Sequence, residues 1–370
     1  MKIAMLTNEF PPSIGGVQTH VFELSKALVD LGHEVHVLTR WKDRSTPRQE
    51  TLNGMHVHRI PLAKSHWIYD WQLSRYLKKL NTEGKLDILH VHGMRPLRAC
   101  SNLDIPVIFT NHTSSFLKRV KQHQSQLDKM AAELSVANLI LAPSEELAEA
   151  TRKCGYKGPV KFIANGVDTK IFAPSPSNLR ERLNIPHDSF VVALARRLYE
   201  KNGVLYLADA IAQLNHPRLH LVVAGAGTDQ EAFERIIRNA GVEDRVHMLG
   251  GVPNHEMPEI YRGCDVSVLP SLMEATSIAG LEAMACGLPL IGTNVGGIPA
   301  ILRHRDNGLL VEPKSPEQLA NALQELINAP STCSQMGHRS RERTIEEFSW
   351  TAIGGETITH YKTCLNIHKS

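Results

Sequence analysis

Two glutamates separated by seven residues are the strongest chemical signal in this sequence. Glu274 lies in a polar stretch after the apolar run Val266–Leu269, and Glu282 lies about one turn inside the helical pattern that follows. Small residues near Ser277 mark the expected start of that helix. Backbone amides at a helix start attract an anion, and a carboxylate beside them can accept hydrogen bonds from hydroxyl groups. This segment could therefore hold a phosphate and two polyhydroxyl groups. The alternative is that both glutamates only interact with the helix dipole.

A cluster of cations follows the first apolar run of the second half of the chain. Arg196, Arg197 and Lys201 lie at the junction between the strand-like segment Val191–Arg196 and the next helical pattern. An arginine fork and a lysine point charge together suit a diphosphate. A surface ion cluster that includes Glu200 is the alternative interpretation.

A loop with two adjacent glycines joins the first expected strand to the first expected helix. Gly15 and Gly16 follow Pro11-Pro12 in this loop. Glycines allow backbone N–H groups to approach a ligand, and the start of a helix favours an anion. The spacing matches neither the dinucleotide-binding pattern nor the Walker pattern. The residues alone therefore leave a ligand-binding loop and a plain tight turn open.

Short apolar runs alternate with helical patterns along most of the chain. From Val17 to Leu31, apolar residues recur every three or four positions, which predicts a helix closed by Gly32. Strands that alternate with helices favour parallel βαβ units. The sequence therefore predicts an α/β fold with two doubly wound domains. The expected strands are Lys2–Thr7, Val35–Thr39, Met55–Ile60, Leu86–Val91, Val107–Thr110, Ala137–Ala142 and Val160–Ile163, then Val191–Arg196, His220–Ala224, Val246–Leu249, Val266–Leu269 and Leu288–Gly292.

Composition marks a boundary between the two halves. Residues 173–189 are rich in proline, serine and other polar side chains, and we expect them to form a linker. This predicts a first domain over residues 1–172 and a second over residues 190–345. A helical segment over residues 346–370 is expected to pack back on the first domain.

The overall composition excludes several classes of protein. Apolar residues make up 42% of the 370 residues and charged residues 21%, which is ordinary for a soluble globular chain. The net charge of +3 is too small for nucleic-acid binding as the main task. No apolar run predicts a membrane span or a signal peptide. Six cysteines without a CxxC pair favour a reducing, cytoplasmic compartment.

The first half of the chain is the more basic one. It contains Lys78-Lys79 and the run Lys118-Arg119-Val120-Lys121. Charge runs of this kind are usually solvated helix faces. The alternative is attraction to an anionic acceptor or to a membrane, which would place the protein peripherally on the inner membrane face.

Taken together, these motifs resemble glycosyltransferase family 4, a group of retaining enzymes with the GT-B fold. The resemblance covers nearly the whole chain, in the family's order. Glu274 to Glu282 looks like the E-x7-E motif, and the continuation to Pro289 looks like the EAMAxGxP stretch. Three further segments resemble family motifs, namely Gly296-Gly297-Ile298-Pro299, Asn165-Gly166-Val167-Asp168-Thr169 with Phe172, and Phe10-Pro11-Pro12 with Gly15-Gly16.

The resemblance implies two Rossmann-like domains facing a cleft, with a nucleotide diphosphate sugar bound mainly by the C-terminal domain. Glu282 would hold the ribose hydroxyls, and Glu274 would hold hydroxyls of the donor sugar. Arg197 and Lys201 would neutralise the diphosphate. The expected phosphate-binding segment is Thr276, Ser277 and Ile278, the last two through backbone amides.

The resemblance also assigns residues of the first domain. Gly15 and Gly16 would let the N-terminal loop close on the donor. Asn111 and His112 lie in a segment that matches the family's cleft histidine, near the reacting sugar. Without the resemblance, a histidine after a strand is more often structural.

Two departures from the family pattern concern the donor site. Thr276-Ser277 stand where many members carry Phe-Gly, which preserves the backbone amides but alters the donor-sugar pocket. Many members space the arginine and the lysine by five residues, as Arg196 and Lys201 are, whereas Arg197 is four residues from Lys201. We assign Arg197 to the site because it precedes Leu198, as in the family's Arg-Leu pair, and keep Arg196 as the alternative.

The expected reaction is sugar transfer with retention to a hydroxyl acceptor in glycan or glycolipid biosynthesis. A UDP-sugar is the favoured donor and GDP-mannose the alternative. The catalytic residues would be His112, Arg197, Lys201 and Glu274, and the departing phosphate oxygen would take the acceptor's proton in a front-face mechanism. The chain has no D-x-D triplet, so we expect neither a metal nor another cofactor. A non-hydrolysing nucleotide-sugar 2-epimerase and a catalytically silent sugar-nucleotide-binding subunit are the alternatives.

Overall fold

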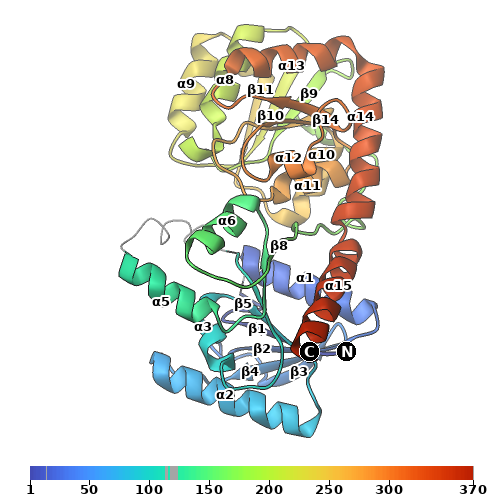
Figure 1. Cartoon of the computed structure of the whole chain (residues 1–370). Coiled ribbons are helices and arrows are strands. Elements are labelled where there is room, and N and C mark those ends of the chain that lie inside the picture. Colours follow the sequence, from blue (N-terminus) through green and yellow to red (C-terminus); the bar gives the residue numbers. More distant parts are fainter. Residues whose placement is uncertain (14, 113–115, 117–123, 370) are drawn as a thin grey trace. The chain divides into compact units, whose positions relative to one another are not determined.

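The chain divides into two compact units. The computed structural model describes residues 1–13, 15–112, 116 and 124–369. The first unit comprises residues 1–166 together with the last helix, α15 (Trp350–Lys369), and the second comprises residues 167–349 (Figure 1). Two separate stretches of sequence therefore build the first unit.

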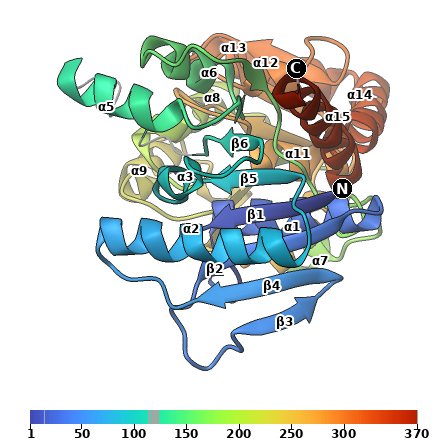
Figure 2. The same cartoon turned by 60° about the horizontal axis from the view of Figure 1, so that its bottom comes forward.

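The first unit contains an eight-stranded sheet with the order β3-β4-β2-β1-β5-β6-β7-β8. Every neighbouring pair is parallel except β3 and β4, which run in opposite directions at one edge (Figure 2). The strand order reverses between β1 and β5. The strands are β1 (Lys2–Thr7), β2 (Glu34–Arg40), β3 (Gln49–Leu52), β4 (Met55–Ile60), β5 (Ile88–His92), β6 (Val107–Thr110), β7 (Leu139–Ala142) and β8 (Val160–Phe162).

Helices cover this sheet and bury a continuous apolar core that includes Leu6, Val91 and Phe109. The first helix ends before Gly32, whose φ of +83° lies in the left-handed region that favours glycine. The helical elements are α1 (Gly16–Asp30), α2 (His66–Glu83), α3 (Met94–Leu97), η1 (Arg98–Cys100), α5 (Gln124–Leu134), α6 (Glu145–Lys153) and α15.

The second unit contains a six-stranded, fully parallel sheet with the order β11-β10-β9-β12-β13-β14. The order reverses between β9 and β12. The strands are β9 (Phe190–Leu194), β10 (Leu219–Ala224), β11 (Val246–Gly250), β12 (Val266–Leu269), β13 (Leu290–Thr293) and β14 (Gly308–Val311). The helical elements are α7 (Leu179–Arg182), η2 (Glu200–Asn202), α8 (Val204–Leu214), α9 (Gln230–Asn239), η3 (Glu243–Arg245), η4 (Asn254–Glu256), α10 (Met257–Arg262), α11 (Ile278–Ala285), α12 (Ile298–Ile301), α13 (Pro316–Asn328), α14 (Pro330–Arg343) and the π-helical η5 (Thr344–Phe348).

The predicted fold class, α/β with two doubly wound sheets, is confirmed. Two strands, β3 and β14, were not expected from the sequence. The first is a half-exposed edge strand with no apolar run, and the second is a short segment that begins at Gly308. Each is held to the sheet by pairing with a neighbour rather than by its own pattern.

The expected linker over residues 173–189 packs as part of the second unit. Leu179 in α7 is fully buried, and Arg180 forms an ion pair of 2.7 Å with Asp265, next to β12. The first unit ends at Gly166 rather than at residue 172, and the second extends to Ser349. The polar composition of residues 173–189 did not indicate this packing, because the residues that the segment contacts lie far away in the sequence.

The C-terminal part is helical, as expected, but it is divided between the units. α14 and η5 belong to the second unit, and α15 packs on α1 in the first. The hydroxyl of Tyr361 in α15 lies 2.7 Å from Nδ1 of His90 in β5, and both side chains are buried. This helix therefore completes the core of the first unit.

Candidate active site

The polar residues of the second unit gather where its strand order reverses. β9 and β12 are adjacent there, and the loops after their carboxyl ends carry Arg196, Lys201 and Glu274. Open α/β sheets bind ligands at such a switch point, beyond the carboxyl ends of the strands. The topology thus brings the cation cluster and the first glutamate to the same end of the sheet.

Arg196 links the two loops by a network of hydrogen bonds. Its Nη2 donates to Oγ of Ser271 at 2.9 Å and to Oδ1 of Asn202 at 3.2 Å, and its Nη1 donates to Oγ of Ser277 at 3.1 Å. The same guanidinium forms an ion pair with Glu274. The side chains of this pair are only 10% and 15% exposed, so the surroundings screen their attraction less than bulk water would.

Arg197, the arginine expected at this site, has an exposed side chain, and among the described residues only its backbone contacts the network. Its backbone carbonyl accepts a hydrogen bond from Nδ2 of Asn202 at 2.6 Å. The alternative, Arg196, occupies the expected place beside Glu274. The Arg-Leu pair marks a position in the sequence, whereas the loop after β9 determines which side chain pairs with Glu274.

Close backbone contacts fix the loop that carries Glu274. The carbonyl of exposed Lys201 accepts a hydrogen bond from the amide of Leu272 at 2.8 Å. On the other side, Gly297 N donates to the carbonyl of Glu274 at 3.1 Å. Gly296 has a φ of +52°, and a Cβ there would lie 1.8 Å from the same carbonyl. Only glycine fits at this position, which gives the Gly296-Gly297 pair a physical role.

Helix α11 begins directly after this loop. Ser277 is its N-cap, and its Oγ accepts a hydrogen bond from Gly280 N at 3.2 Å. Thr276 and Ser277 are buried, whereas the side chain of Ile278 is exposed. Amides in the first turn of a helix lack partners within the helix. The expected phosphate-binding segment therefore lies at the start of α11, with Arg196 bonded to its cap.

Glu282 lies on the buried side of α11 and is only 6% exposed. Its Oε1 accepts a hydrogen bond from Asn254 Nδ2 at 2.8 Å, and its Oε2 lies 3.4 Å from the hydroxyl of Tyr261. Burial raises the pKa of this carboxyl to about 7, and the two hydrogen bonds oppose the rise. Glu282 can therefore change its charge near neutral pH.

The glycine loop of the first unit leads into α1. The carbonyl of Gly15 accepts a hydrogen bond from Thr19 N at 3.0 Å, so helical bonding begins at this residue. A Cβ on Gly15 would meet the side chain of Gln18 at 2.5 Å, whereas one on Gly16 would meet nothing within 4 Å. Gly16 thus leaves open space beside the helix start, while the neighbouring Ile14 lies outside the described residues.

A cluster of histidines surrounds His112. His112 follows buried Asn111 after β6, and its Nε2 lies 2.9 Å from Nδ1 of His92 at the end of β5. The ring of His20 in α1 meets His112 edge-on, with 4.4 Å between the ring centroids. Nδ1 of His20 lies 3.2 Å from Oδ1 of Asn165. The basic run over residues 118–121 lies outside the described residues.

Burial keeps these histidines neutral at pH 7. It lowers the pKa of His20 to about 4 and the pKa values of His92 and His112 well below 6.5. Neutral imidazoles offer lone pairs, and one nitrogen from each ring lies within 4.8 Å of the others, so this trio could hold a metal ion. Glu34, His36 and His56, near the β4 side of the same sheet, form a second group of this kind among the described residues.

Comparison with known proteins identifies the chain. The model of glycosyl transferases group 1 matches residues 176–343, and that of glycosyltransferase family 4 matches residues 14–171. The chain belongs to glycosyltransferase family 4. It is therefore a glycosyltransferase, and its two parallel-sheet units are those of the GT-B fold.

Similar proteins cover almost the entire glycosyltransferase chain. An uncharacterized glycosyltransferase of Methanocaldococcus jannaschii is 29% identical, with 99% of each chain covered. A D-inositol 3-phosphate glycosyltransferase of Catenulispora acidiphila is 25% identical, with 95% of this chain and 91% of that protein covered. The structure of Anabaena HepE in complex with UDP is similar, with a TM-score of 0.79, 22% identity, and 98% and 100% of the two chains covered.

Several residues of the histidine cluster were not expected from the sequence. His20, His90 and His92 lie on a buried helix face and on alternate positions of a buried strand. The alternation of His90 and His92 could have indicated the cluster, because side chains two positions apart in a strand lie on the same face of the sheet. In the second unit, Ser271 and Asn254 gave no signal because each bonds a side chain that lies far away in the sequence.

None of the described helices is both long and apolar enough to span a membrane. All six cysteines are free and buried.

Proposed function

We propose that this glycosyltransferase binds a nucleotide diphosphate sugar in the second unit and transfers the sugar to a hydroxyl acceptor with retention. The observation that carries the proposal is the network that joins Arg196 to Glu274 and to Ser277, the N-cap of α11. It places a cation, a carboxylate and a helix start together at the switch point of a parallel sheet.

We assign a role in donor binding to the groups of this network and to two neighbouring residues, Lys201 and Glu282. Arg196, the amides at the start of α11 and the exposed Lys201 stabilise the negative charge on the diphosphate as the sugar leaves. Charge stabilisation of this kind is usually the largest catalytic contribution. Glu274 accepts hydrogen bonds from the donor sugar, and Glu282 from the ribose. The cation and the helix start perform the work that a divalent ion does in metal-dependent transferases, so we propose metal-independent turnover.

In the first unit, we propose that His112 hydrogen-bonds the transferred sugar as a neutral imidazole. Its pKa lies well below 6.5 because it is buried beside other histidines, which makes it a weak base. The departing phosphate oxygen is then the better acceptor for the proton of the attacking hydroxyl, and this supports a front-face mechanism. Asn111, Gly15 and Gly16 belong to the same proposed substrate-binding region of this unit.

A UDP-sugar is the proposed donor, and GDP-mannose is the alternative. The similar HepE structure contains UDP, which supports the first choice. The acceptor would be an anionic or lipid-linked hydroxyl compound, because the first half is basic and one relative is named for D-inositol 3-phosphate. We place the reaction in the cytoplasm, since six free, buried thiols suit a reducing compartment.

The first test is a thermal-shift screen of UDP, GDP and their sugars, with EDTA present. A ligand that binds only the folded protein raises its melting temperature. We expect a shift with one base that is larger for one of its sugars. The shift should vanish in Arg196→Ala and persist in Arg197→Ala. An equal loss in both variants, or no shift with any nucleotide sugar, would contradict the assignment of the donor site.

The alternative activities predict different kinetics. A 2-epimerase would interconvert two donors without an acceptor, and a silent subunit would bind a donor without turnover on any acceptor. Following the donor by chromatography with and without candidate acceptors separates these outcomes from transfer. Consumption of the donor that depends on an acceptor supports the transferase proposal.

A further inference from the structure

The outer face of α2 in the first unit carries an unusual exposed surface. Trp67 and Trp71 are 79% and 57% exposed, and Ile68 between them is exposed as well. The opposite face of the helix is buried in the core through Tyr69, Leu73, Leu77 and Leu80. The exposed tryptophans therefore do not belong to the packing of α2, and two indoles one turn apart share one side of the helix.

Cations continue this face along the helix. Arg75 and Lys78 are exposed beyond Trp71, and the guanidinium of Arg75 lies 5.5 Å from the centroid of the Trp71 ring. Within the described part of the chain, neither cation has an ion pair with a carboxylate. We call Trp67, Ile68, Trp71, Arg75 and Lys78 the outer face of α2.

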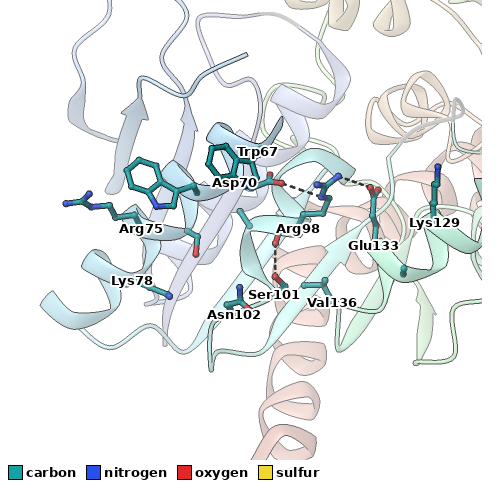
Figure 3. A pocket seen from close by; sticks show the side chains of 14 residues that line it. Trp67, Asp70, Arg75, Lys78, Arg98, Ser101, Asn102, Lys129, Glu133 and Val136 are labelled. Atoms are coloured by element: carbon teal, nitrogen blue, oxygen red, sulfur yellow. Dashed lines mark hydrogen bonds and ion pairs between the residues drawn. The ribbon is translucent and has the colours of Figure 1, made fainter. Parts of the chain in front are cut away.

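A hollow of about 890 Å³ adjoins this face, between α2, η1 and α5 (Figure 3). Arg98 lies within it and is bound to Asp70 at 3.3 Å and to Glu133 at 3.4 Å. Arg98 offsets one of these two negative charges, and Arg75 and Lys78 of the outer face of α2 also line the hollow. Lys129 on α5 adds a further exposed cation at the far side (Figure 3). The hollow therefore has a net positive charge.

A second hollow of about 590 Å³ lies on the other side of the same helix. Trp71 and Arg75 line both hollows, and Arg48 and Lys79 add positive charge to the second. The outer face of α2 is thus a ridge of two indoles and a guanidinium between two basic depressions.

We propose that the outer face of α2 docks the first unit on the surface of an anionic lipid bilayer. Indole rings favour the boundary between headgroups and acyl chains. Lysines and arginines near an anionic leaflet are attracted to its surface potential. The two hollows can receive phosphate headgroups while the indoles between them enter the interface. Because the apolar face of α2 is occupied by the core, the helix binds through its exposed side chains and does not insert.

A bilayer explains these features better than a protein partner does. The exposed apolar part consists of three side chains at one end of the helix, surrounded by cations. The centre of a protein interface is instead depleted of charged residues and of lysine in particular. The proposal does not depend on the donor site, because docking requires neither donor nor acceptor.

Vesicle co-sedimentation without substrates tests the proposal. We expect the full chain to bind vesicles that contain phosphatidylglycerol, to bind pure phosphatidylcholine vesicles at least about tenfold more weakly, and to dissociate in about 1 M salt. Arg75→Glu with Lys78→Glu should weaken binding at least about tenfold. Trp67→Phe with Trp71→Phe should remove the quenching of tryptophan emission by brominated lipid, because the other two tryptophans, Trp41 and Trp350, lie outside this face.

The matched control is Arg235→Glu with Arg238→Glu on α9, which reverses two exposed arginines at the same spacing in the second unit. This variant should bind vesicles like the wild type. Three results would overturn the proposal, namely no wild-type binding to anionic vesicles, equal binding to neutral vesicles, or an equal loss in the control. Loss of turnover on soluble substrates in the Arg75/Lys78 variant, with vesicles absent, would instead assign the face to substrate or to a protein partner.

Discussion

Replacing Arg196 by methionine should damage both the stability of the second unit and the reaction, for one physical reason. The Arg196 side chain is 10% exposed, and its guanidinium is bonded to Glu274 and to three other side chains. Methionine fills much of the space but leaves the 15% exposed Glu274 carboxylate unpaired. Removing one partner of a buried ion pair costs about 3–5 kcal/mol. For a unit of this size, that lowers the melting temperature by about 6–20 °C.

A double variant separates the structural effect from the catalytic one. Glu274→Gln removes the charge that Arg196→Met leaves unpaired, so the double variant should recover much of the lost melting temperature. Its activity should stay about 10²–10³-fold below the wild type, because the group that stabilises the diphosphate is still missing. Thermal melts and initial rates at saturating donor measure the two effects independently.

Arg197→Met is the matched control. Its side chain is exposed, so the change in stability should stay within about 0.5 kcal/mol, and turnover should be near that of the wild type. Loss of turnover in Arg197→Met together with normal turnover in Arg196→Met would refute the reasoning and restore the assignment made from the sequence.

Three further perturbations test the site. The pKa of Glu282 rises from 4.5 to about 7 on folding, so the folded chain binds this proton more tightly than the unfolded chain does. The free energy of unfolding should therefore fall by about 3 kcal/mol as the pH rises from about 4.5 to 7. Thermal melts of Glu282→Gln should lack this loss. The KM for the donor should rise below about pH 7 in the wild type and stay flat in Glu282→Gln, and parallel profiles would contradict a role in ribose binding. Gly296→Ala should lower the donor affinity measured by calorimetry without any change of charge, since a Cβ there meets the Glu274 carbonyl. The control Gly251→Ala, where a Cβ meets open space, should bind the donor with the affinity of the wild type. EDTA should leave initial rates unchanged; rates abolished by EDTA and restored by Mg²⁺ or Mn²⁺ would show that turnover needs a metal.

The sequence predicted the fold class because buried parallel strands produce apolar runs. Val191–Arg196 and Val266–Leu269 mark β9 and β12 almost to the residue. Strand β3 was missed because it is half exposed at an edge and has no such run. The polar composition of residues 173–189 predicted a linker, because polar residues are typical of solvent-exposed segments. Composition does not indicate that Arg180 pairs with Asp265, which lies far away in the sequence.

The candidate site shows the same limit at the level of single side chains. The spacing of Glu274 and Glu282 was readable because both lie within one loop and helix. Which arginine pairs with Glu274 was not readable, because the answer depends on Ser271 and Ser277, which reach Arg196 only after β9 and β12 pair. His20 and His92 likewise meet His112 only in the folded first unit.

The division of the chain has a consequence for its synthesis. The second unit, residues 167–349, is continuous and is inserted between two stretches of the first. The amide of Val167 donates to the carbonyl of Phe348 at 2.9 Å, so the start and the end of the insert are bonded to each other. On the ribosome, the insert can therefore complete its fold while the first unit still lacks α15 and the Tyr361 contact with His90. Translation that stops after Ser349 would release a finished second unit attached to an unfinished first one.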